Sequence, residues 1–298
     1  MSAIDFIKTL QGEVQNFTQD LSTEEGYWIV KGFIDVYKRI YAMPSDTKVV
    51  SKVLELFLIP KLVQFGVQHG YSFALAAEQN FYPDISFISE SNPHEMYAID
   101  IKSTYRIDSE NVNGMTLGAF TGYFRDRLSR KNTQFPYSAY KAHLVLGVIY
   151  SRYDALSLSD GTINPKETNT YSLEQLDQIK SVIRDFVFFI QPKYRIASAR
   201  PGSGNTRNIG SVTRIQQLLD GAGPFAALGE AVYDDYWMNY LNADMARKIE
   251  STPRYNNLQT YTIYKQQSID ISLAEAAKLD ATDTGSERDI QDDTSTPD

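Results

Sequence analysis

Two aspartates and a lysine stand where their side chains could hold a metal ion. Asp84 belongs to the stretch Tyr-Pro-Asp-Ile-Ser-Phe-Ile, and Asp100 and Lys102 belong to the stretch Ala-Ile-Asp-Ile-Lys-Ser-Thr. Both stretches alternate polar with apolar residues, which is the pattern of a half-buried strand. Residues 89–94 between them are rich in turn formers, so we expect an antiparallel hairpin over residues 82–104.

The expected register brings the two carboxylates together. A hairpin that is symmetric about Asn92 pairs residues whose numbers sum to 184, so Asp84 faces Asp100. Like charges that face each other in this way destabilise a sheet, so the pair needs a cation or a shared proton. Lys102 lies on the same face as Asp100. The pattern predicts a cradle for a hard cation such as Mg²⁺, which proteins hold with one or two carboxylates plus phosphate oxygens and water. The alternative is a surface hairpin whose charges are solvated.

Composition narrows the class of protein. The chain has 298 residues, no cysteine and only three histidines, His69, His94 and His143, which lack metal-ligand spacing. Any metal site must therefore use oxygen ligands, and disulfides are excluded. No apolar run is long enough to cross a bilayer, and the first residues lack the apolar core of a secretory signal. We therefore expect a cytoplasmic protein that does not associate with membranes.

Charge is distributed unevenly along the chain. Residues 266–298 carry a formal charge of −7 out of the total of −8, so residues 1–265 are close to neutral at −1. The acidic segment is poor in aromatic residues, and we expect a disordered tail with at most a short helix over residues 272–279. We expect residues 1–265 to form one domain. Residues 26–42 within it mix aromatic residues with glycine and are a candidate subunit contact.

The elements around the hairpin can be anticipated from periodicity. Ser45 or Asp46 is a good N-cap for a helix that begins near residue 47 and ends at His69 or Gly70. Glu55 lies in that helix, either on a solvent face or as a third carboxylate aimed at the metal site. A strand over 71–75 and buried strands ending near 151 and over 182–190 complete an α/β pattern, in which His143 is expected to be a packing residue. The densest basic cluster, residues 125–131, is either a solvated face or a phosphate contact.

A second informative stretch is the glycine-rich loop Arg200-Pro-Gly-Ser-Gly-Asn-Thr-Arg-Asn-Ile-Gly210. It lacks the Gly-Lys-Ser/Thr of a Walker loop, and Arg207 stands where a dinucleotide-binding fingerprint needs glycine. Glycines allow close approach of the backbone to a partner, and Asn, Arg and Thr side chains can bond or touch base edges in the major groove. The loop suits base reading, and an ordinary flexible loop is the alternative.

Several blocks in the same order give the chain a family resemblance. Asp84, Asp100 and Lys102 match the PD-(D/E)xK nuclease pattern, and the wider match resembles the EcoRV family of type II restriction endonucleases. The resemblance runs from about Pro44 to Tyr261, which excludes the acidic tail. The blocks that carry it include Ser45-Asp46-Thr47-Lys48-Val49, Glu55-Leu56-Phe57, Gln79-Asn80, Tyr82-Pro83-Asp84, Ala98-Ile99-Asp100-Ile101-Lys102, Thr116-Leu117-Gly118, Gly202-Ser203-Gly204-Asn205-Thr206, Asn208-Ile209-Gly210-Ser211 and Asp235-Tyr236-Trp237.

The resemblance implies a fold, an activity and partners. The fold would be a central mixed β-sheet flanked by helices, of the restriction-endonuclease type. The activity would be Mg²⁺-dependent hydrolysis of both strands of a short palindromic duplex, such as GATATC, leaving blunt ends with 5′-phosphates. A homodimer would embrace the DNA, since a twofold protein matches a twofold site. A cognate DNA methyltransferase would be expected in the host.

The resemblance also implies roles for particular residues. Asp84, Asp100 and Ile101 would hold the metal ion, Lys102 would be catalytic, and Glu55 would assist with an additional metal. The glycine-rich loop would read base edges in the major groove, and the turn at Gln79 and Asn80 would approach the minor groove. The residues expected to contact DNA are Thr47, Lys48, Ser51, Gln79, Asn80, Thr104, Gly202, Ser203, Gly204, Asn205, Thr206, Arg207 and Asn208.

Three positions depart from the family pattern. Arg207 replaces threonine, Glu78 replaces glutamine and Phe81 replaces histidine, all in segments expected to face DNA. These departures bear on the sequence that is recognised, while the nuclease assignment depends on Asp84, Asp100 and Lys102. Two alternatives stay open: a repair or junction nuclease with the same core, and a DNA-binding protein without catalysis.

Overall fold

The computed structural model describes residues 3–78, 80–153, 170–202 and 207–283. The chain divides into two compact units, residues 1–238 and 239–298, which are described separately. Among the described residues, no helix is both long and apolar enough to cross a membrane.

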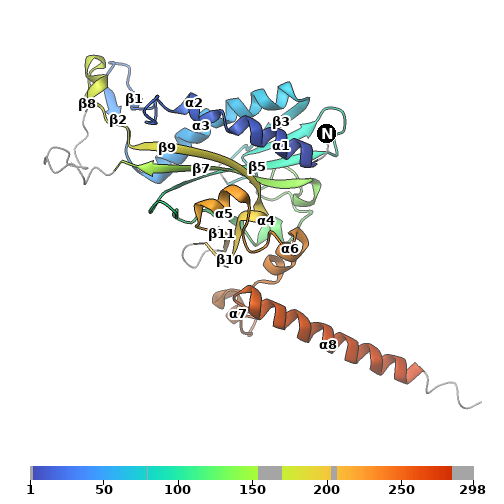
Figure 1. The fold of residues 1–298 in the computed structure, drawn as a ribbon. Helices are drawn as coiled ribbons and strands as arrows, with labels where there is room; N and C mark the ends of the chain where they lie inside the picture. Colours follow the sequence, from blue (N-terminus) through green and yellow to red (C-terminus); the bar gives the residue numbers. More distant parts are fainter. Residues whose placement is uncertain (1–2, 79, 154–169, 203–206, 284–298) are drawn as a thin grey trace, which may run out of the picture. The chain divides into compact units, whose positions relative to one another are not determined.

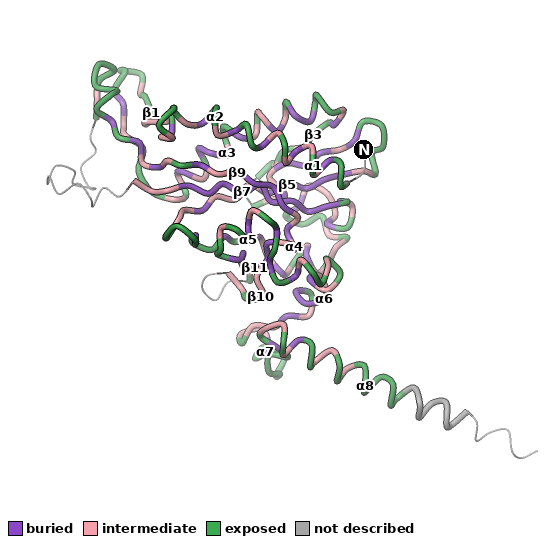
Figure 2. The backbone as a smooth tube through the Cα atoms, viewed as in Figure 1, coloured by how far each residue is buried: buried purple, intermediate pink, exposed green. Residues whose placement is uncertain are grey.

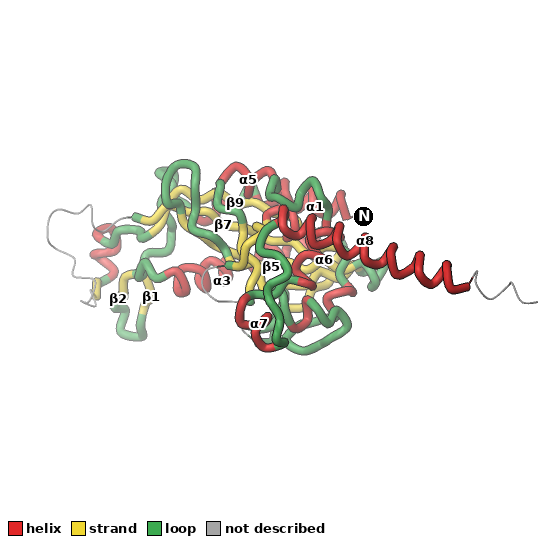
Figure 3. Tube along the Cα trace, turned by 90° about the horizontal axis from the view of Figure 1, so that it is seen from below, coloured by secondary structure: helices red, strands yellow, loops and turns green. Residues whose placement is uncertain are grey.

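A five-stranded mixed sheet forms the centre of the first unit (Figure 1). Its strand order is β3 (Tyr71–Leu75), β4 (Ile85–Ser89), β5 (Met96–Tyr105), β7 (Ala142–Arg152) and β9 (Ile183–Pro192). Only the β5–β7 pair is parallel, and the other three neighbouring pairs are antiparallel. Seen from below, β7 and β9 run side by side through the unit (Figure 3). The expected fold class, a central mixed sheet flanked by helices, is confirmed.

The β4–β5 hairpin has the register that the sequence predicts. Ile85 pairs with Ile99 and Ile88 pairs with Met96, so paired numbers sum to 184. The expectation of half-buried strands is wrong, because most residues of β4 and of the first half of β5 are buried on both faces (Figure 2). Ser86 is fully buried, and its hydroxyl is satisfied by Gln134 at 2.9 Å and Tyr140 at 2.7 Å. Polar alternation in this hairpin therefore marks internal hydrogen bonding rather than a solvent face.

Helices α1 (Ala3–Val14), α2 (Phe17–Leu21) and α3 (Thr47–Gln68) cover one face of the sheet (Figure 1). The apolar core lies between them and the strands, with Phe6, Leu54 and Phe87 among its fully buried members. α3 begins where the sequence predicts, because the Asp46 carboxylate accepts the backbone N–H groups of Lys48 at 2.9 Å and Val49 at 3.2 Å. The helix ends at Gln68 with His69 as its C-cap, and Gly70 follows with φ = +75°.

A second, smaller sheet lies on the other side of the central sheet (Figure 1). Its order is β10 (Ala197–Pro201), β11 (Asn208–Ser211) and β6 (Thr116–Ala119), so the two strands that flank the glycine-rich loop form a hairpin against β6. Helices α4 (Lys193–Ile196), α5 (Ile215–Asp220) and α6 (Glu230–Asn239) accompany it. This sheet fixes both ends of the loop that is expected to read bases.

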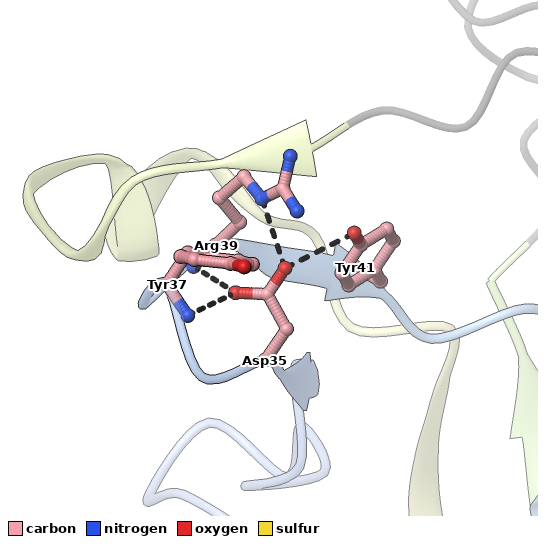
Figure 4. A network of polar contacts seen from close by, with 4 residues as sticks. All are labelled: Asp35, Tyr37, Arg39 and Tyr41. Carbon is pink, nitrogen blue, oxygen red and sulfur yellow. Dashed lines mark hydrogen bonds and ion pairs between the residues drawn. The ribbon is translucent and has the colours of Figure 1, made fainter.

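A third sheet is formed by β1 (Gly32–Ile34), β2 (Ile40–Ala42) and β8 (Thr170–Tyr171), followed by a 3-10 helix over Leu173–Gln178. Asp35 organises the β1–β2 turn (Figure 4). Its carboxylate accepts the backbone N–H groups of Tyr37 and Arg39, the Arg39 Nε–H at 2.8 Å and the Tyr41 hydroxyl at 3.2 Å. In this turn Val36 is 90% exposed and Tyr37 is 76% exposed. Four hydrogen bonds to one carboxylate make this apolar tip well ordered.

The second unit contains α7 (Ala243–Lys248) and α8 (Leu258–Asp283). Tyr255 packs against Tyr240, Tyr261 and Tyr264 at ring-centroid distances of 5.1 to 6.0 Å. The helix predicted over residues 272–279 is part of the much longer α8. The domain boundary predicted after residue 265 falls inside α8, and residues 284–298 lie outside the described part, so that division and the disorder of the tail stay predictions.

Candidate active site

Asp84 and Asp100 meet where β4 and β5 come together. Asp84 directly precedes β4, and its Oδ2 accepts the backbone N–H of Ile101 at 2.6 Å, which turns the carboxylate toward β5. Asp100 is buried in β5, and its Oδ2 lies 2.8 Å from the Lys102 Nζ. The Lys102 ammonium also donates to the Ile101 carbonyl at 3.3 Å. The sequence-predicted trio of Asp84, Asp100 and Lys102 is therefore assembled around the Ile101 peptide.

The electrostatics of the trio reflect burial and close charges. Burial, followed by the neighbouring charge of Asp100, raises the pKa of the Asp84 carboxyl to about 7. Burial lowers the pKa of the Lys102 ammonium, but the charges of Asp100 and Asp84 outweigh it and raise that pKa above its ordinary value. A carboxyl that resists ionisation beside a second carboxyl is a site that an added cation would stabilise.

Asp84 and Lys102 border a groove of about 1000 Å³ between α3, β5 and β6, whereas Asp100 is buried and does not line it. Asp84, Ile101 and Lys102 line it from the sheet. The residues of α3 that line it are Thr47, Lys48, Ser51, Lys52 and Glu55. Thr104, Asn113, Gly114 and Thr116 line the far part of the same groove. Four predicted DNA contacts, Thr47, Lys48, Ser51 and Thr104, thus share one surface with the carboxylates.

Glu55 lies in the groove beside the trio without joining it. Its carboxylate pairs with Lys52 Nζ at 2.6 Å, and its charge contributes to raising the pKa of Asp84. Within the described residues, no three His, Asp or Glu side chains gather closely enough to hold an ion together. Glu55 therefore belongs to the polar wall of the groove, on the face shared with Lys48 and Ser51.

Two hydroxyl groups link the groove wall to the sheet. Ser51 Oγ lies 2.7 Å from Ser103 Oγ, which ties α3 to β5 beside Lys102. Thr104 is buried, and its hydroxyl donates to the backbone carbonyl of Asn113. Both predicted contacts thus also hold the frame of the groove in place.

The segments that are expected to read bases lie only partly within the described residues. Gly202 donates its N–H to the Asn208 carbonyl at 2.8 Å, and the carbonyl of exposed Arg207 accepts the N–H of Phe120 at 2.9 Å. Ser203, Gly204, Asn205 and Thr206 lie outside the described residues, and so does Gln79. Asn80 is exposed in the turn before β4, and Glu78 lines the groove.

Two sequence interpretations are settled by packing. His143 is buried, stacks on Tyr137 at a centroid distance of 3.6 Å and lies 2.8 Å from the Tyr82 hydroxyl through Nδ1, so it is a packing residue as expected. Burial lowers the pKa of His143 well below its ordinary value, which keeps the ring neutral. Arg127 of the basic cluster pairs with Asp234 at 2.6 Å and lies over the Tyr137 ring, so it is neither a solvated residue nor a free phosphate contact.

Sequence reasoning missed the aromatic wall behind the carboxylates. Tyr82, Tyr123 and Tyr137 stack on one another at centroid distances of 5.1 to 5.9 Å. The ammonium of buried Lys193 lies 4.1 Å from the centre of the Tyr82 ring. A lysine that directly follows a long apolar strand was the available signal, because such a position is expected to be buried.

The donor set fits a hard divalent cation. Two carboxylates and a main-chain carbonyl meet at a groove, and oxygen donors of this kind suit Mg²⁺ or Mn²⁺ rather than a soft metal. Paired acidic residues and a lysine on adjacent strands of a mixed sheet, open to a polar groove, define a nuclease of the PD-(D/E)xK class.

Comparison with known proteins narrows that class. The sequence model of the family described as restriction endonuclease EcoRV matches residues 24–266. The type II restriction enzyme EcoRV of Escherichia coli is 34% identical over 242 residues, which cover 81% of this chain and 92% of that enzyme. The chain belongs to the EcoRV restriction endonuclease family. It is therefore a type II site-specific deoxyribonuclease whose substrate is DNA, in a family that generally needs a divalent metal.

Proposed function

We propose that the protein uses Mg²⁺ to cleave both strands of a short palindromic duplex site, related to GATATC, leaving blunt ends with 5′-phosphates. The observation that carries this proposal is the convergence of Asp84, Asp100 and Lys102 at the Ile101 peptide, on a groove lined by polar side chains of α3. Membership of the EcoRV family supports the mode of cleavage.

The four groups at the centre have separate roles in this proposal. Asp84, Asp100 and the Ile101 carbonyl would hold the ion, and a bound ion would neutralise charge on the phosphate and lower the pKa of water. Lys102 would orient the attacking water or stabilise charge on the phosphorane. Its ion pair with Asp100 at 2.8 Å keeps the ammonium beside the carboxylates. Glu55 assists with an additional ion, which requires release of its ion pair with Lys52.

DNA contacts are assigned to three segments. Thr47, Lys48, Ser51 and Thr104 face the backbone along the groove, where Lys48 supplies positive charge. The loop from Gly202 to Asn208 reads base edges in the major groove, and Gln79 and Asn80 approach the minor groove. Glu78, Phe81 and Arg207 stand in these segments and depart from the family pattern, so the recognised sequence is the part of the proposal most open to change.

A homodimer is the expected functional unit. A palindromic site has twofold symmetry, and a twofold protein presents one catalytic groove to each strand. The ordered tip of the β1–β2 turn, with Val36 and Tyr37 exposed, is a suitable subunit contact within residues 26–42. A host methyltransferase that protects the same site and a cytoplasmic location complete the proposal.

Digestion of plasmid DNA by wild-type protein and by Asp84→Ala tests this function. Wild-type protein with Mg²⁺ should give discrete fragments, and Asp84→Ala should remain dimeric and cut at least 10³-fold more slowly, roughly the cost of losing a metal ligand. Cutting by Asp84→Ala at the wild-type rate would refute the site assignment. Structure-selective nicking by the wild type would indicate a repair or junction nuclease, and salt-dependent binding without cutting would indicate a non-catalytic protein.

A further inference from the structure

Lys193 is a buried cation that the proposed chemistry does not use. Its side chain is 3% exposed, and its ammonium lies 4.1 Å from the ring centre of Tyr82 and 5.9 Å from that of Tyr137. Within the described part of the chain, no carboxylate lies at ion-pair distance from this ammonium. Burying an ammonium against aromatic rings without an ion pair is costly, so a compensating interaction is needed.

The nearest sequence neighbours of the ring that Lys193 contacts include Asp84, because Tyr82 is two residues before it. Burial lowers the pKa of Lys193 to about 8, and Asp100 is the carboxylate that opposes this most, ahead of Asp84 and Glu230. Lys193 is not among the residues that line the groove, and the charges of both members of the acidic pair act on its ammonium. Lys102 holds the groove side of the same pair through Asp100.

Lys193 also contacts the segment that carries Asp84, through the ring of Tyr82. The ring of Tyr82 beneath its ammonium is fixed by the hydroxyl contact to His143 at 2.8 Å, and Tyr82 is two residues before Asp84. On its other side the ammonium lies beside Gly118 of β6, since a Cβ built there would be 3.7 Å from Nζ. Lys193 thus stands where the catalytic sheet and the smaller sheet meet.

We propose that Lys193 is a positioning residue, a buried internal counter-charge that stabilises the Asp84–Asp100 pair and competes electrostatically with the divalent ion for these carboxylates. This inference rests on the proposed function, in which that pair holds the ion. Because an ammonium and a divalent cation near the same carboxylates repel each other, removing the ammonium strengthens ion binding. A residue that served only to fill space would not change ion affinity in this direction.

The test measures Mn²⁺ binding in the absence of DNA, followed by the paramagnetic resonance signal of the free ion. The full-length protein is used at pH ~7.5, where Lys193, with a pKa of about 8, is mainly charged. Lys193→Met removes the charge and keeps the approximate shape, and Lys193→Arg keeps the charge. Lys61→Met is the matched control, because Lys61 also lies over a ring, that of Phe17 at 5.8 Å, but pairs with Asp20 outside the groove.

Lys193→Met should bind Mn²⁺ about tenfold more tightly, which corresponds to ~1.4 kcal/mol, whereas Lys193→Arg and Lys61→Met should match the wild type. In cleavage assays the half-saturating Mg²⁺ concentration should fall in Lys193→Met, and a mere loss of folded protein would leave that concentration unchanged. Unchanged or weaker Mn²⁺ binding by Lys193→Met would overturn the inference.

Two further variants keep the test decisive. If Lys193→Met does not fold, Lys193→Gln is judged by the same criterion. Asp84→Ala should lose Mn²⁺ binding, and if it binds like the wild type, then the proposed metal site itself has failed. Wild-type-like affinity in the Lys193 variants, together with loss of binding in Asp84→Ala, would refute the role of Lys193 alone.

Discussion

At the scale of single residues, the Asp84 carboxyl is poised between two states. Its Oδ2 accepts the Ile101 N–H, which favours the ionised form, while burial and Asp100 favour the protonated form and dominate. The metal-free site is therefore under electrostatic stress that a cation relieves. This stress has a measurable consequence for stability.

Asp84→Asn should stabilise the metal-free protein at neutral and higher pH. Because the folded-state pKa of Asp84 is about 7 against an ordinary 3.8, the folded protein binds more protons than the unfolded chain between these values. The stability contributed by protonated Asp84 is complete below 3.8 and is lost as pH rises through about 7. Urea unfolding without metal should show the variant to be more stable above pH 7, with a difference that disappears in acid.

Two controls sharpen this measurement. Adding Mg²⁺ should stabilise the wild type more than Asp84→Asn, because the variant lacks a ligand charge. Asp108→Asn should not stabilise the protein at any pH, because the backbone of Glu110 lowers the pKa of exposed Asp108. Equal stability of wild type and Asp84→Asn across the pH range would contradict a strained carboxyl pair.

The central trio could be predicted from the sequence because its members are close along the chain. A single hairpin register places Asp84 opposite Asp100, and that register is observed in the neighbouring pairs. Lys193 and the stacked tyrosines could not be predicted, because they reach the site from segments that only the tertiary fold brings together. Arg127 was misread for the same reason, since its partner Asp234 is remote in sequence.

At the scale of elements, periodicity and caps located helix α3 and the strands of the central sheet, but not the short strands outside it. α3 begins at the Asp46 cap and ends at Gln68 with His69 as its C-cap, next to the predicted end, and β3 occupies the predicted residues 71–75. Burial of the hairpin on both faces was not foreseen, because alternating serines suggested a solvent face. The small sheet around the glycine-rich loop was also missed, since its strands have four or five residues and pair with distant β6.

 Gly147→Ala should destabilise β7 at the position that pairs with Lys102 of β5, because a Cβ at Gly147 would overlap the buried ring of Phe189. Overpacking of this kind costs about 1–3 kcal/mol, and we expect a loss of that size in the free energy of unfolding. Cleavage should slow as well, because β5 carries both Asp100 and Lys102.

Gly12→Ala is the matched control for this substitution. Gly12 lies in α1, and a Cβ there would meet no atom within 4 Å. Alanine is favoured over glycine in a helix by about 1 kcal/mol, so this variant should be slightly more stable and fully active. Equal stability of Gly147→Ala and wild type in denaturant titrations would show that the β7–β9 packing is looser than described.

At the scale of the whole molecule, the charge distribution matters more than the net charge. The total of −8 would oppose DNA binding, but residues 1–265 carry only −1. In the groove, three lysines balance the carboxylates of Glu55, Glu78 and Asp84. The family match ends at residue 266, so most of the net negative charge lies beyond the part of the chain shared with the family.

Removal of residues 284–298, which carry a formal charge of −4, should strengthen non-specific DNA binding at low salt. The effect should fade as salt rises, because screening weakens repulsion between exposed charges. Binding isotherms on a duplex that lacks the recognition site, measured at several salt concentrations without metal, would show this. Identical affinities for the full-length and shortened proteins at low salt would mean that the acidic end does not act on DNA.

The central claim is that Asp84, Asp100 and Lys102 form a metal-dependent centre which cuts one palindromic sequence in both strands. The most direct measurement is to map every 5′ end produced from one sequenced plasmid, with Mg²⁺ as the only added divalent cation. The account predicts ends at a single recurring palindrome, opposite one another in the two strands, and none with Asp84→Ala. Ends scattered over unrelated sequences, or the same ends from Asp84→Ala, would contradict it.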